Sequence, residues 1–441
     1  MMLSIDEQAR KIIRRLQSAG FQAYLVGGSV RDLLLGRRPA EWDITTSAQP
    51  AEVGRLFPKV IPTGIDFGTV TVLANDLPYE VTTFRSDEQY IDGRHPANVR
   101  FTADLHQDLA RRDFTINALA YDPEKQLLVD DFNGQVDLKN RLIRTVGNPL
   151  ERFREDGLRP VRGCRLAATL DFVLEKQTLL AITDCLETVK KVAAERVHDE
   201  LVKLLKADKP SIGLEYMRQS GLLQLLLPEV AACYQVAQPP EFHPHDVYWH
   251  SLYACDAAPK DWPLVRLAAL LHDIGKPACK VEMTFYNHDQ VGKELAGQLL
   301  KRLKFSNDDI AQVVNLVGTH MFDYSREWSD AAVRRFIRRI GGRQNVASVF
   351  ALRRADAAAM KQDIGLAYLT ELQQRIDKII ADENALHVAD LKIDGHDVMQ
   401  TLNIKPGPQV GKILNELLER VLDDPSLNDR ATLLALVKQH A

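Results

Sequence analysis

Two carboxylates one residue apart, Glu41 and Asp43, lie in the short segment EWDIT, whose composition predicts a β-strand. Residues i and i+2 of a strand point to the same face, so these two side chains could share one or two Mg²⁺ ions. A few hard oxygen ligands are what Mg²⁺ bound to nucleotide phosphates prefers. For an isolated pair of this kind, a polar edge strand is the alternative.

A third carboxylate, Glu80, lies in the apolar strand pattern of residues 78–84. Three acidic side chains that converge from neighbouring strands repel one another unless cations neutralise them. Two-metal phosphoryl transfer requires this arrangement, because one ion activates a hydroxyl while the other holds the leaving group. We therefore interpret Glu41, Asp43 and Glu80 as candidate catalytic residues.

A glycine turn precedes this acidic strand. The predicted strand 21–26 (FQAYLV) runs into Gly27, Gly28 and Ser29, and a helical pattern, VRDLLLG, follows. A strand, a glycine turn and a helix N-terminus together offer backbone N–H groups to a triphosphate. Most glycine pairs after a strand are ordinary turns, and the acidic strand that follows is what favours a phosphate site here.

Charged residues recur every three positions in the segment 155–165. On a helix they form one ridge of Asp156, Arg159, Arg162 and Arg165. A ridge of one carboxylate and several guanidinium groups offers acceptors and donors together, which the Watson–Crick edge of a base requires. The alternative is a ladder of ion pairs on a solvated helix. Pro160 fits a helix only within its first turn or two.

A second group of chemically active residues lies far along the chain. His250, His272 with Asp273 in LLHDIGKP, and Asp356 resemble the HD-domain pattern. Imidazole and carboxylate ligands together suit Mn²⁺, Ni²⁺, Fe²⁺ or Zn²⁺, and His288 and His320 could extend the site to two metals. A metal-bound hydroxide there could hydrolyse phosphoesters. The alternative is a helical body in which these residues are hydrogen-bonded core partners.

The elements that must position these residues change character along the chain. Residues 1 to about 145 alternate helical patterns with short apolar or β-branched runs, among them 69–74 (TVTVLA) and 79–84 (YEVTTF). From about residue 150 onward, amphipathic helical patterns dominate. The sequence therefore predicts an α+β head followed by an all-helical body and tail.

The composition is that of an ordinary globular protein, with 441 residues of which 45% are hydrophobic and 26% charged. Five cysteines without a C-x-x-C pair favour a reduced, cytoplasmic setting with buried thiols. No apolar run approaches the roughly 18 residues that span a bilayer, so we expect no membrane segment.

A net charge of −4 argues at first against a nucleic-acid partner. However, four arginines, Arg334, Arg335, Arg338 and Arg339, alternate with an apolar stripe that includes Phe336. One helix could therefore bury its apolar face and present four guanidinium groups outward to RNA phosphates. A solvated helix face is the alternative.

Several motifs in one unbroken order resemble a known family. They are GGSVRD, EWDITT, RRDFTINALA (111–120), DDFNGQVDLKNRLIRTVG (130–147), REDGLRPVRGCRLA (154–167) and ERVHDELVKLL (195–205). They resemble the nucleotidyltransferase head and neck of class II tRNA nucleotidyltransferases and bacterial poly(A) polymerases. One departure is Glu41, because the family usually carries Asp-x-Asp, and the extra methylene of glutamate moves its carboxylate.

The resemblance assigns roles to individual residues. Gly28 and Arg31 would contact the triphosphate, and Arg112, Asp113 and Asn117 would hold the phosphates and read the ribose hydroxyls. Asp156 and Arg159, helped by Arg162 and Arg165, would pair with the incoming base in place of a nucleic-acid template. Lys405 and Lys412, in the segment that precedes an amphipathic helix near the C-terminus, would contact the tRNA, and an ordinary helix–helix turn is the alternative. Arg334 and Arg338 are the candidates for RNA contact from the arginine stripe.

Two segments favour one branch of this family. Residues 63–72 (TGIDFGTVTV) resemble the CCA-adding pattern, where bacterial poly(A) polymerases tend to carry a basic G-R-R-F run. The loop 85–96 (RSDEQYIDGRHP) resembles the flexible element associated with adding the terminal A. The resemblance therefore implies addition of the 3′-terminal CCA to tRNA from CTP and ATP, with Mg²⁺ as cofactor and pyrophosphate as the leaving group.

Other functions remain open from the sequence. Within the family they are addition of only the terminal A, and poly(A) synthesis. Outside it they are an HD phosphohydrolase whose head senses nucleotides, and a tRNA-binding protein with a worn metal site.

The resemblance also implies a division into four domains. Residues 1–145 would form a polymerase-beta-like head with a small mixed sheet, and 146–215 a helical neck that selects the nucleobase. Residues 216–360 would form a helical body with the HD motif and a second divalent transition metal, and 361–441 a helical tail that binds tRNA.

Overall fold

The computed structural model describes residues 3–90, 96–361, 366–382 and 385–440. The chain folds into two compact units, Met1–Ala231 and Ala232–Ala441, each of which is described by itself. The α+β class, with a mixed sheet in the N-terminal part and helices in the remainder, is confirmed. The finer division into four domains remains a prediction.

In the first unit, the described residues form a mixed sheet with the strand order β3-β4-β5-β2-β1-β8-β9. The pair β2–β5 is parallel, and the other neighbours are antiparallel. The strands are β1 (Ala23–Val26), β2 (Asp43–Thr46), β3 (Val60–Gly64), β4 (Thr69–Ala74), β5 (Leu77–Thr83), β8 (Ala120–Asp122) and β9 (Leu127–Val129). Two ribbons join β6 (Arg85–Tyr90) to β7 (Pro96–Phe101), and β10 (Leu142–Ile143) to β11 (Val173–Leu174).

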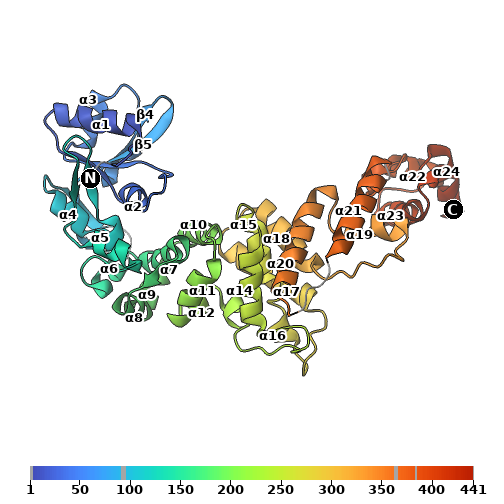
Figure 1. Cartoon of the computed structure of the whole chain (residues 1–441). Coiled ribbons are helices and arrows are strands. Elements are labelled where there is room, and N and C mark those ends of the chain that lie inside the picture. The colour runs from blue at the N-terminus through green and yellow to red at the C-terminus, as the bar shows by residue number, and fades with distance from the viewer. Residues whose placement is uncertain (1–2, 91–95, 362–365, 383–384, 441) are drawn as a thin grey trace. The chain divides into compact units, whose positions relative to one another are not determined.

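Helix α1 covers the sheet because its apolar residues recur with helical spacing. Ala9, Ile12, Ile13 and Leu16 are buried and lie on one face, where α1 contacts β1 and β2. Figure 1 shows α1 and α3 beside the strands. The helices of this unit are α1 (Glu7–Ser18), α2 (Gly28–Leu34), α3 (Pro50–Leu56), α4 (Leu105–Ala110), α5 (Gly134–Lys139), α6 (Pro149–Glu155), α7 (Arg159–Leu170), α8 (Lys176–Asp184), α9 (Leu186–Val189), α10 (Ala194–Leu205), α11 (Pro210–Gln219), α12 (Leu222–Leu226) and α13 (Pro228–Ala231).

The strand predicted to begin at Glu41 begins at Asp43 instead, so the expectation that Glu41 lies in this strand is wrong. The reason lies in both neighbouring strands. The partner β1 ends at Val26, after which the chain turns away at Gly27. On the other side, the register of β2 with β5 would place Glu41 opposite Pro78, which has no N–H to donate. Glu41 therefore approaches the site from a loop.

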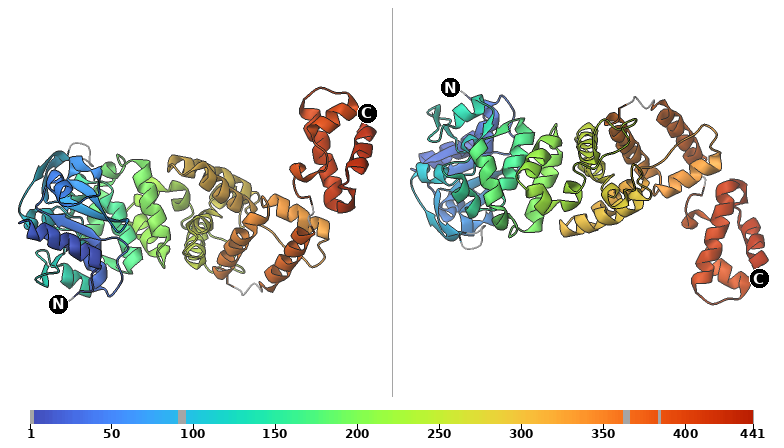
Figure 2. Two further views of the ribbon diagram at one scale, coloured as in Figure 1. Left: turned by 90° about the horizontal axis from the view of Figure 1, so that it is seen from above. Right: turned by 90° about the horizontal axis from the view of Figure 1, so that it is seen from below.

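The second unit is helical throughout its described secondary structure, apart from one isolated β-bridge. Near its end, α22, α23 and α24 lie side by side around a core of leucine, isoleucine and valine side chains (Figure 2). Its helices are α14 (Val247–Ala257), α15 (Pro263–Leu271), α16 (Lys276–Cys279), α17 (His288–Arg302), α18 (Asn307–Thr319), α19 (Asp330–Arg339), α20 (Val346–Ala358), α21 (Ala367–Ala381), α22 (Gly395–Leu402), α23 (Pro408–Asp423) and α24 (Arg430–Val437).

The predicted turn before the amphipathic helix α23 is present, with Gly407 as the N-cap. Lys405 and Lys412, the two lysines predicted to contact RNA, are exposed on either side of it. Among the described residues, no helix is both long enough and apolar enough to cross a membrane. All five cysteines are free thiols, and four of them are buried, as expected.

The arginine stripe on α19 does not present four guanidinium groups outward, so this expectation is wrong. Arg334 is buried, and its guanidinium donates to the carbonyl oxygens of Leu422 at 2.7 Å and Asp423 at 3.3 Å. These carbonyls belong to the last turn of α23, where no helical N–H remains to pair with them. Arg338 pairs with Glu419 of α23, although the side chain of Arg338 is partly exposed. The arginine side chains therefore join α19 to α23. The amphipathic pattern alone could not predict this contact, because it does not show which later helix covers the polar face.

Replacing Arg334 with Met should therefore destabilise the second unit, since it keeps the apolar stem but leaves helix-end carbonyls without a donor. We expect a loss of about 1–3 kcal/mol in the free energy of unfolding, measured by urea denaturation. Arg338→Met, which removes a partly exposed ion pair, should cost about 0–1 kcal/mol. Equal losses in the two variants would contradict the capping role of Arg334.

Candidate active site

A cleft of about 690 Å³ in the first unit brings together every residue predicted for the catalytic and nucleotide-binding sites of the head and neck. They come from the sheet, the glycine turn, the segment around α4, and α7. The predicted residues that line the cleft are Gly28, Arg31, Glu41, Asp43, Glu80, Arg112, Asp113, Asn117, Asp156, Arg159, Arg162 and Arg165. Side chains 87–99, which cover most of the predicted flexible loop 85–96, lie outside the described residues.

Asp43 and Glu80 are direct partners across the parallel pair β2–β5, so their side chains leave the sheet on the same face. Burial and repulsion by Glu41 raise the pKa of Asp43, although the nearby Arg112 acts in the opposite direction. Removal from water and the charges of Asp43 and Glu41 also raise the pKa of Glu80. The three carboxylates therefore carry negative charge that the neighbouring side chains do not fully balance. Oxygen ligands with uncompensated charge fit Mg²⁺.

The predicted glycine turn lies between β1 and α2, and its first position requires glycine. Gly27 has a φ of +73°, in the left-handed region that favours glycine. A Cβ atom on this residue would lie 3.1 Å from Nη1 of Arg112 and 3.6 Å from Oδ2 of Asp43. The bare backbone therefore lets the turn, Arg112 and the carboxylate of Asp43 approach one another closely.

Two arginines of the cleft are held by acceptors other than Glu41, Asp43 and Glu80. Arg31 donates to Oδ1 of Asn117 at 2.8 Å and pairs with Asp32. Arg112 donates to Oδ2 of the fully buried Asp108 at 3.2 Å. Although burial acts to raise the pKa of Asp108, the charges of Arg111 and Arg112 lower it. Asp108 therefore stays ionised and fixes both arginines at the cleft wall.

Asp113 lies in the wall of the cleft next to α7. Its Oδ1 accepts from the amide of Asn117 at 3.1 Å, and its Oδ2 accepts from Arg162 at 3.0 Å. Burial acts to raise the pKa of Asp113, but Arg162 and Asn117 lower it to about 2. Because Asp113 is occupied on both oxygens, its first effect is to orient Asn117 and Arg162.

The predicted ridge is not one continuous helical ridge. Asp156 ends α6 in an extended conformation, and α7 begins at Arg159, so the expectation that both lie on one helix is wrong. Pro160 stands in the first turn of α7, the position at which a helix accepts it. The break turns Asp156 and Arg159 toward the same cleft from separate backbone segments.

Helix α10 supplies three cleft residues that the sequence analysis missed, namely Arg196, Glu200 and Lys203. Arg196 donates from both terminal nitrogens to the two carboxylate oxygens of Asp156, at 3.1 and 2.9 Å. Buried Glu200 accepts from Arg165 at 2.5 Å. The spacing i, i+4 and i+7 places the three on one helix face and was the available signal.

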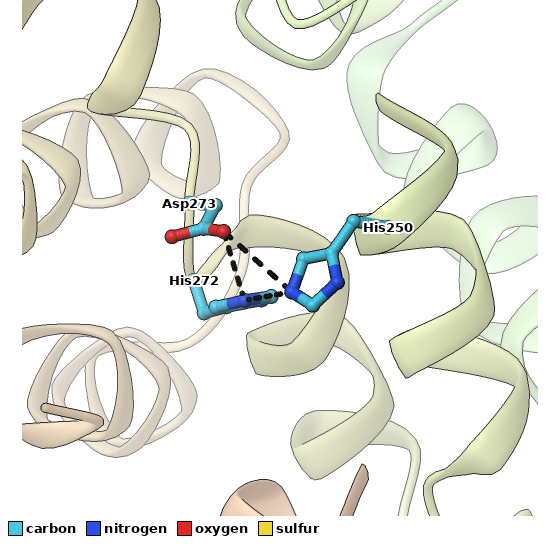
Figure 3. Close-up of side chains that lie close together, drawn as sticks. All are labelled: His250, His272 and Asp273. Carbon is cyan, nitrogen blue, oxygen red and sulfur yellow. Dashed lines mark hydrogen bonds and ion pairs between the residues drawn. The ribbon is translucent and has the colours of Figure 1, made fainter. Parts of the chain in front are cut away.

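A second cluster, separate from this cleft, lies in the second unit. Nε2 of His250 lies 3.2 Å from Nε2 of His272 and 3.0 Å from Oδ1 of Asp356. Nε2 of His272 lies 3.2 Å from Oδ2 of Asp273. Figure 3 shows His250, His272 and Asp273 pointing toward a common centre. All four residues are buried, and the structure thus brings together the predicted HD set.

Replacing Asp43 with Asn should stabilise the metal-free protein at neutral pH. A carboxyl whose pKa is raised by folding adds stability below its unfolded pKa, and this contribution is lost as pH rises through the folded pKa. At pH 7 the ionised Asp43 therefore costs free energy that Asn does not. We expect a higher Tm in EDTA, by about 2–4 °C for each kcal/mol relieved, and little difference near about pH 3.

Mg²⁺ should raise the Tm of the wild-type chain and have a much smaller effect on Asp43→Asn. The matched control is Asp66→Asn, which neutralises an exposed carboxylate outside the cleft. An unchanged or lower Tm of Asp43→Asn in EDTA would show that the carboxylate is not under electrostatic strain.

Three family models match successive parts of the chain. Residues 23–144 match the poly(A) polymerase head domain, and residues 171–234 match the RNA and SrmB-binding site of polymerase A. Residues 284–437 match the second domain of tRNA nucleotidyltransferases. The matched regions follow the order in which the sequence motifs occur.

Relatives of known name match the chain over almost its whole length. The CCA-adding enzyme of Streptococcus gordonii is 33% identical over 443 aligned residues, which cover 98% of this chain and 97% of the relative. That of Lactococcus lactis is 34% identical with the same coverage. The crystal structure of the Bacillus stearothermophilus CCA-adding enzyme in complex with CTP has a TM-score of 0.74 at 27% identity, covering 98% of this chain and 97% of that one. The chain belongs to the family of CCA-adding enzymes.

Proposed function

We propose that this chain adds the 3′-terminal CCA to tRNA from CTP and ATP, with Mg²⁺ and without a nucleic-acid template. The observation that carries the proposal is the single cleft lined by the three carboxylates, the arginines and the pair Asp156–Arg159. The names of the full-length relatives support the same activity. The free thiols support a reducing, cytoplasmic location.

In the proposed reaction, Glu41 and Asp43 hold Mg²⁺, which when bound neutralises the triphosphate and favours ionisation of the tRNA 3′-hydroxyl. Arg31 and Arg112 bind the phosphates, and Gly28 offers its backbone to them. Glu80 accepts the proton of the 3′-hydroxyl, for which its raised pKa suits it. The 3′-oxygen then forms a bond to the α-phosphorus, and the bond to the β-phosphate oxygen breaks to release pyrophosphate.

The ribose of the incoming nucleotide faces Asp113 and Asn117 in this proposal. Asn117 already accepts from Arg31 and donates to Asp113, so its amide is fixed in one orientation. A ribose hydroxyl both donates and accepts, and a fixed amide can satisfy it from one side. Arg162 and Arg165 contribute positive charge along the adjacent wall.

Base selection is assigned to Asp156 and Arg159. Asp156 accepts from Arg196 and from the backbone N–H of Leu158, which leaves part of its acceptor capacity for an exocyclic amino group. Nη1 of Arg159 donates to Glu155 and to the carbonyl of Arg152, while Nη2 donates to the carbonyl of Arg111.

Arg159 therefore has donors left. Within the described part of the chain, its Nε–H carries no protein acceptor, and its Nη2 has one acceptor for two hydrogens. Cytosine and adenine both present an exocyclic amino group next to a ring nitrogen that accepts. A carboxylate beside an arginine with donors left matches this pattern, whereas uracil and guanine carry a carbonyl where the amino group should be.

Alternatives within the family differ at two segments. Phe67 and Thr69, from the stretch that resembles the CCA-adding pattern, line the cleft, and so does Arg85 at the start of the loop. Their position beside the nucleotide residues supports full CCA addition over synthesis of a poly(A) tail. Addition of only the terminal A remains the second candidate.

Asp43→Ala should abolish nucleotide addition while leaving tRNA binding nearly intact, because the ion serves the chemistry more than the docking. We expect incorporation of labelled CMP to fall by at least about 100-fold, since loss of groups that merely support a metal ligand already costs about 10–100-fold. The comparison variant is Glu41→Asp, which restores the usual family spacing and should retain activity. CMP incorporation by Asp43→Ala within tenfold of wild type would refute the metal assignment.

Asp156→Ala should relax discrimination between bases and slow addition of the correct nucleotides. An unpaired buried polar group costs about 1–3 kcal/mol, so we expect the preference for CTP over UTP to fall by roughly 5- to 150-fold. The measurement is incorporation of each of the four nucleotides onto tRNA that ends in C or CC. Arg31→Ala is the control, because it touches no base and should weaken all four triphosphates alike. Equal losses for all four nucleotides in Asp156→Ala would make its role structural.

We further propose that a divalent transition metal binds His250, His272, Asp273 and Asp356 in the second unit. Three of the donor atoms lie within 4.8 Å of one another, and mixed imidazole and carboxylate ligands suit such ions. Hydrolysis of phosphoesters at the metal site remains a prediction.

The exposed residues Lys405, Lys412 and the partly exposed Arg338 remain candidates for contact with tRNA, whereas Arg334 is occupied by α23.

A further inference from the structure

We propose that the aromatic ring of Phe67 stacks on the base of the tRNA 3′-terminal nucleotide, which is the acceptor of the next addition. The inference rests on the proposed function and adds the place where the acceptor end binds. Phe67 lines the same cleft as the three carboxylates. It is the last residue of η1 (Ile65–Phe67), the 3₁₀ turn that precedes β4, and it is 37% exposed.

The order of the strands separates two sides of the cleft. Asp43 begins β2, the central strand of the sheet. Gly28 follows β1 and Asn117 precedes β8, so these two residues, proposed to bind the incoming nucleotide, lie on one side of β2. The other side of the cleft is formed by β5, the start of β4 and the turn before it. Because the acceptor must reach the α-phosphate from a side that the incoming nucleotide does not fill, it approaches over β4 and β5.

Two threonines form the cleft wall between Glu80 and Phe67. Glu80 and Thr82 alternate along β5 and therefore point to the same face of the sheet. Thr82 is the register partner of Thr69 on β4, and the two hydroxyl oxygens lie 3.1 Å apart. Both threonines line the cleft. A hydroxyl can donate one hydrogen bond and accept two, so this pair keeps capacity for a ribose whose 3′-oxygen lies at Glu80.

The backbone around Phe67 is fixed by its neighbours. Nη1 of Arg85 donates to the carbonyl oxygen of Phe67 at 2.7 Å, and the guanidinium carbon lies 5.9 Å from the centroid of the ring. The next residue, Gly68, has a φ of +77°, and its carbonyl accepts from the N–H of Thr83 at 2.8 Å. A Cβ atom on Gly68 would lie 2.7 Å from the ring of Phe101. A ring on such a turn loses little conformational freedom when a base packs against it.

Aromatic stacking suits the acceptor because its terminal base changes during the reaction. In the proposed function, the chain extends first the discriminator nucleotide, then the first C and then the second C. The contact to the terminal base must therefore accept different bases, whereas the contacts to the incoming base must select one. Every base has a π-face, so stacking on an aromatic side chain tolerates any sequence. Phe67 offers this tolerant surface, and the pair Asp156–Arg159 offers the selective one.

The test compares tRNA that ends at an intact discriminator nucleotide with tRNA whose terminal residue is abasic, each with saturating CTP. For the wild-type chain, we expect kcat/KM for tRNA to fall roughly 5- to 150-fold when the base is removed, as expected for the loss of one base–aromatic stack. Phe67→Leu keeps the apolar bulk but has no ring. It should therefore lower the value for intact tRNA by a similar factor and leave the value for abasic tRNA nearly unchanged.

Phe67→Tyr keeps the ring and should behave like the wild type. The KM for CTP and the preference for CTP over UTP should change in neither variant, because the incoming base is bound elsewhere. The matched control is Ile65→Ala, since Ile65 is exposed on the same turn and is not among the residues that line the cleft. It should leave both kcat/KM values unchanged.

Equal slowing of intact and abasic tRNA by Phe67→Leu would overturn the stacking, and a raised KM for CTP would assign the ring to the incoming nucleotide instead. Wild-type addition that is indifferent to the terminal base would also overturn the inference, and the proposed function would stand. If the wild-type chain adds no CMP to intact tRNA, both fall. The wild-type comparison decides the question even where Phe67→Leu does not fold.

Discussion

The parallel pairing of β2 with β5 places Asp43 directly beside Glu80, and this enforced repulsion governs the rest of the first unit. Burial raises the pKa of both carboxyls, and Glu41 adds a third negative charge from a loop. Such a trio is stable only next to compensating positive charge. The site thus stores an electrostatic cost that a bound cation would relieve.

Other carboxylates of the first unit hold the arginines of the cleft. Asp108 holds Arg112, Asp113 holds Arg162, and Glu200 holds Arg165. In the proposed function, one side of each arginine is fixed in this way and its remaining donors serve phosphate or base. The grouping of these arginines in one cleft explains how a chain with a net charge of −4 can present a cleft suited to a nucleotide.

Much of the fold and of the candidate site could be predicted from the sequence, because strand patterns and short motifs depend on local geometry. A run of β-branched and apolar residues predicted the strand 69–74, and the presence of Asp43 and Glu80 in two predicted strands indicated that they converge. What failed depended on partners distant in the chain. Glu41 lies outside the strand because its neighbours stop pairing, and Arg334 is buried because α23 covers it. The sequence analysis missed Arg196 because its ion-pair partner, Asp156, lies 40 residues away in the chain.

In the proposed function, one cleft made of protein alone directs both C and A addition. This is tested by supplying the purified wild-type chain with tRNA that ends at the discriminator base, together with CTP, ATP or both, and reading the product length. We expect extension by two residues with CTP alone, none with ATP alone, and three with both. Extension with ATP alone, or addition only to tRNA that already ends in CC, would contradict it.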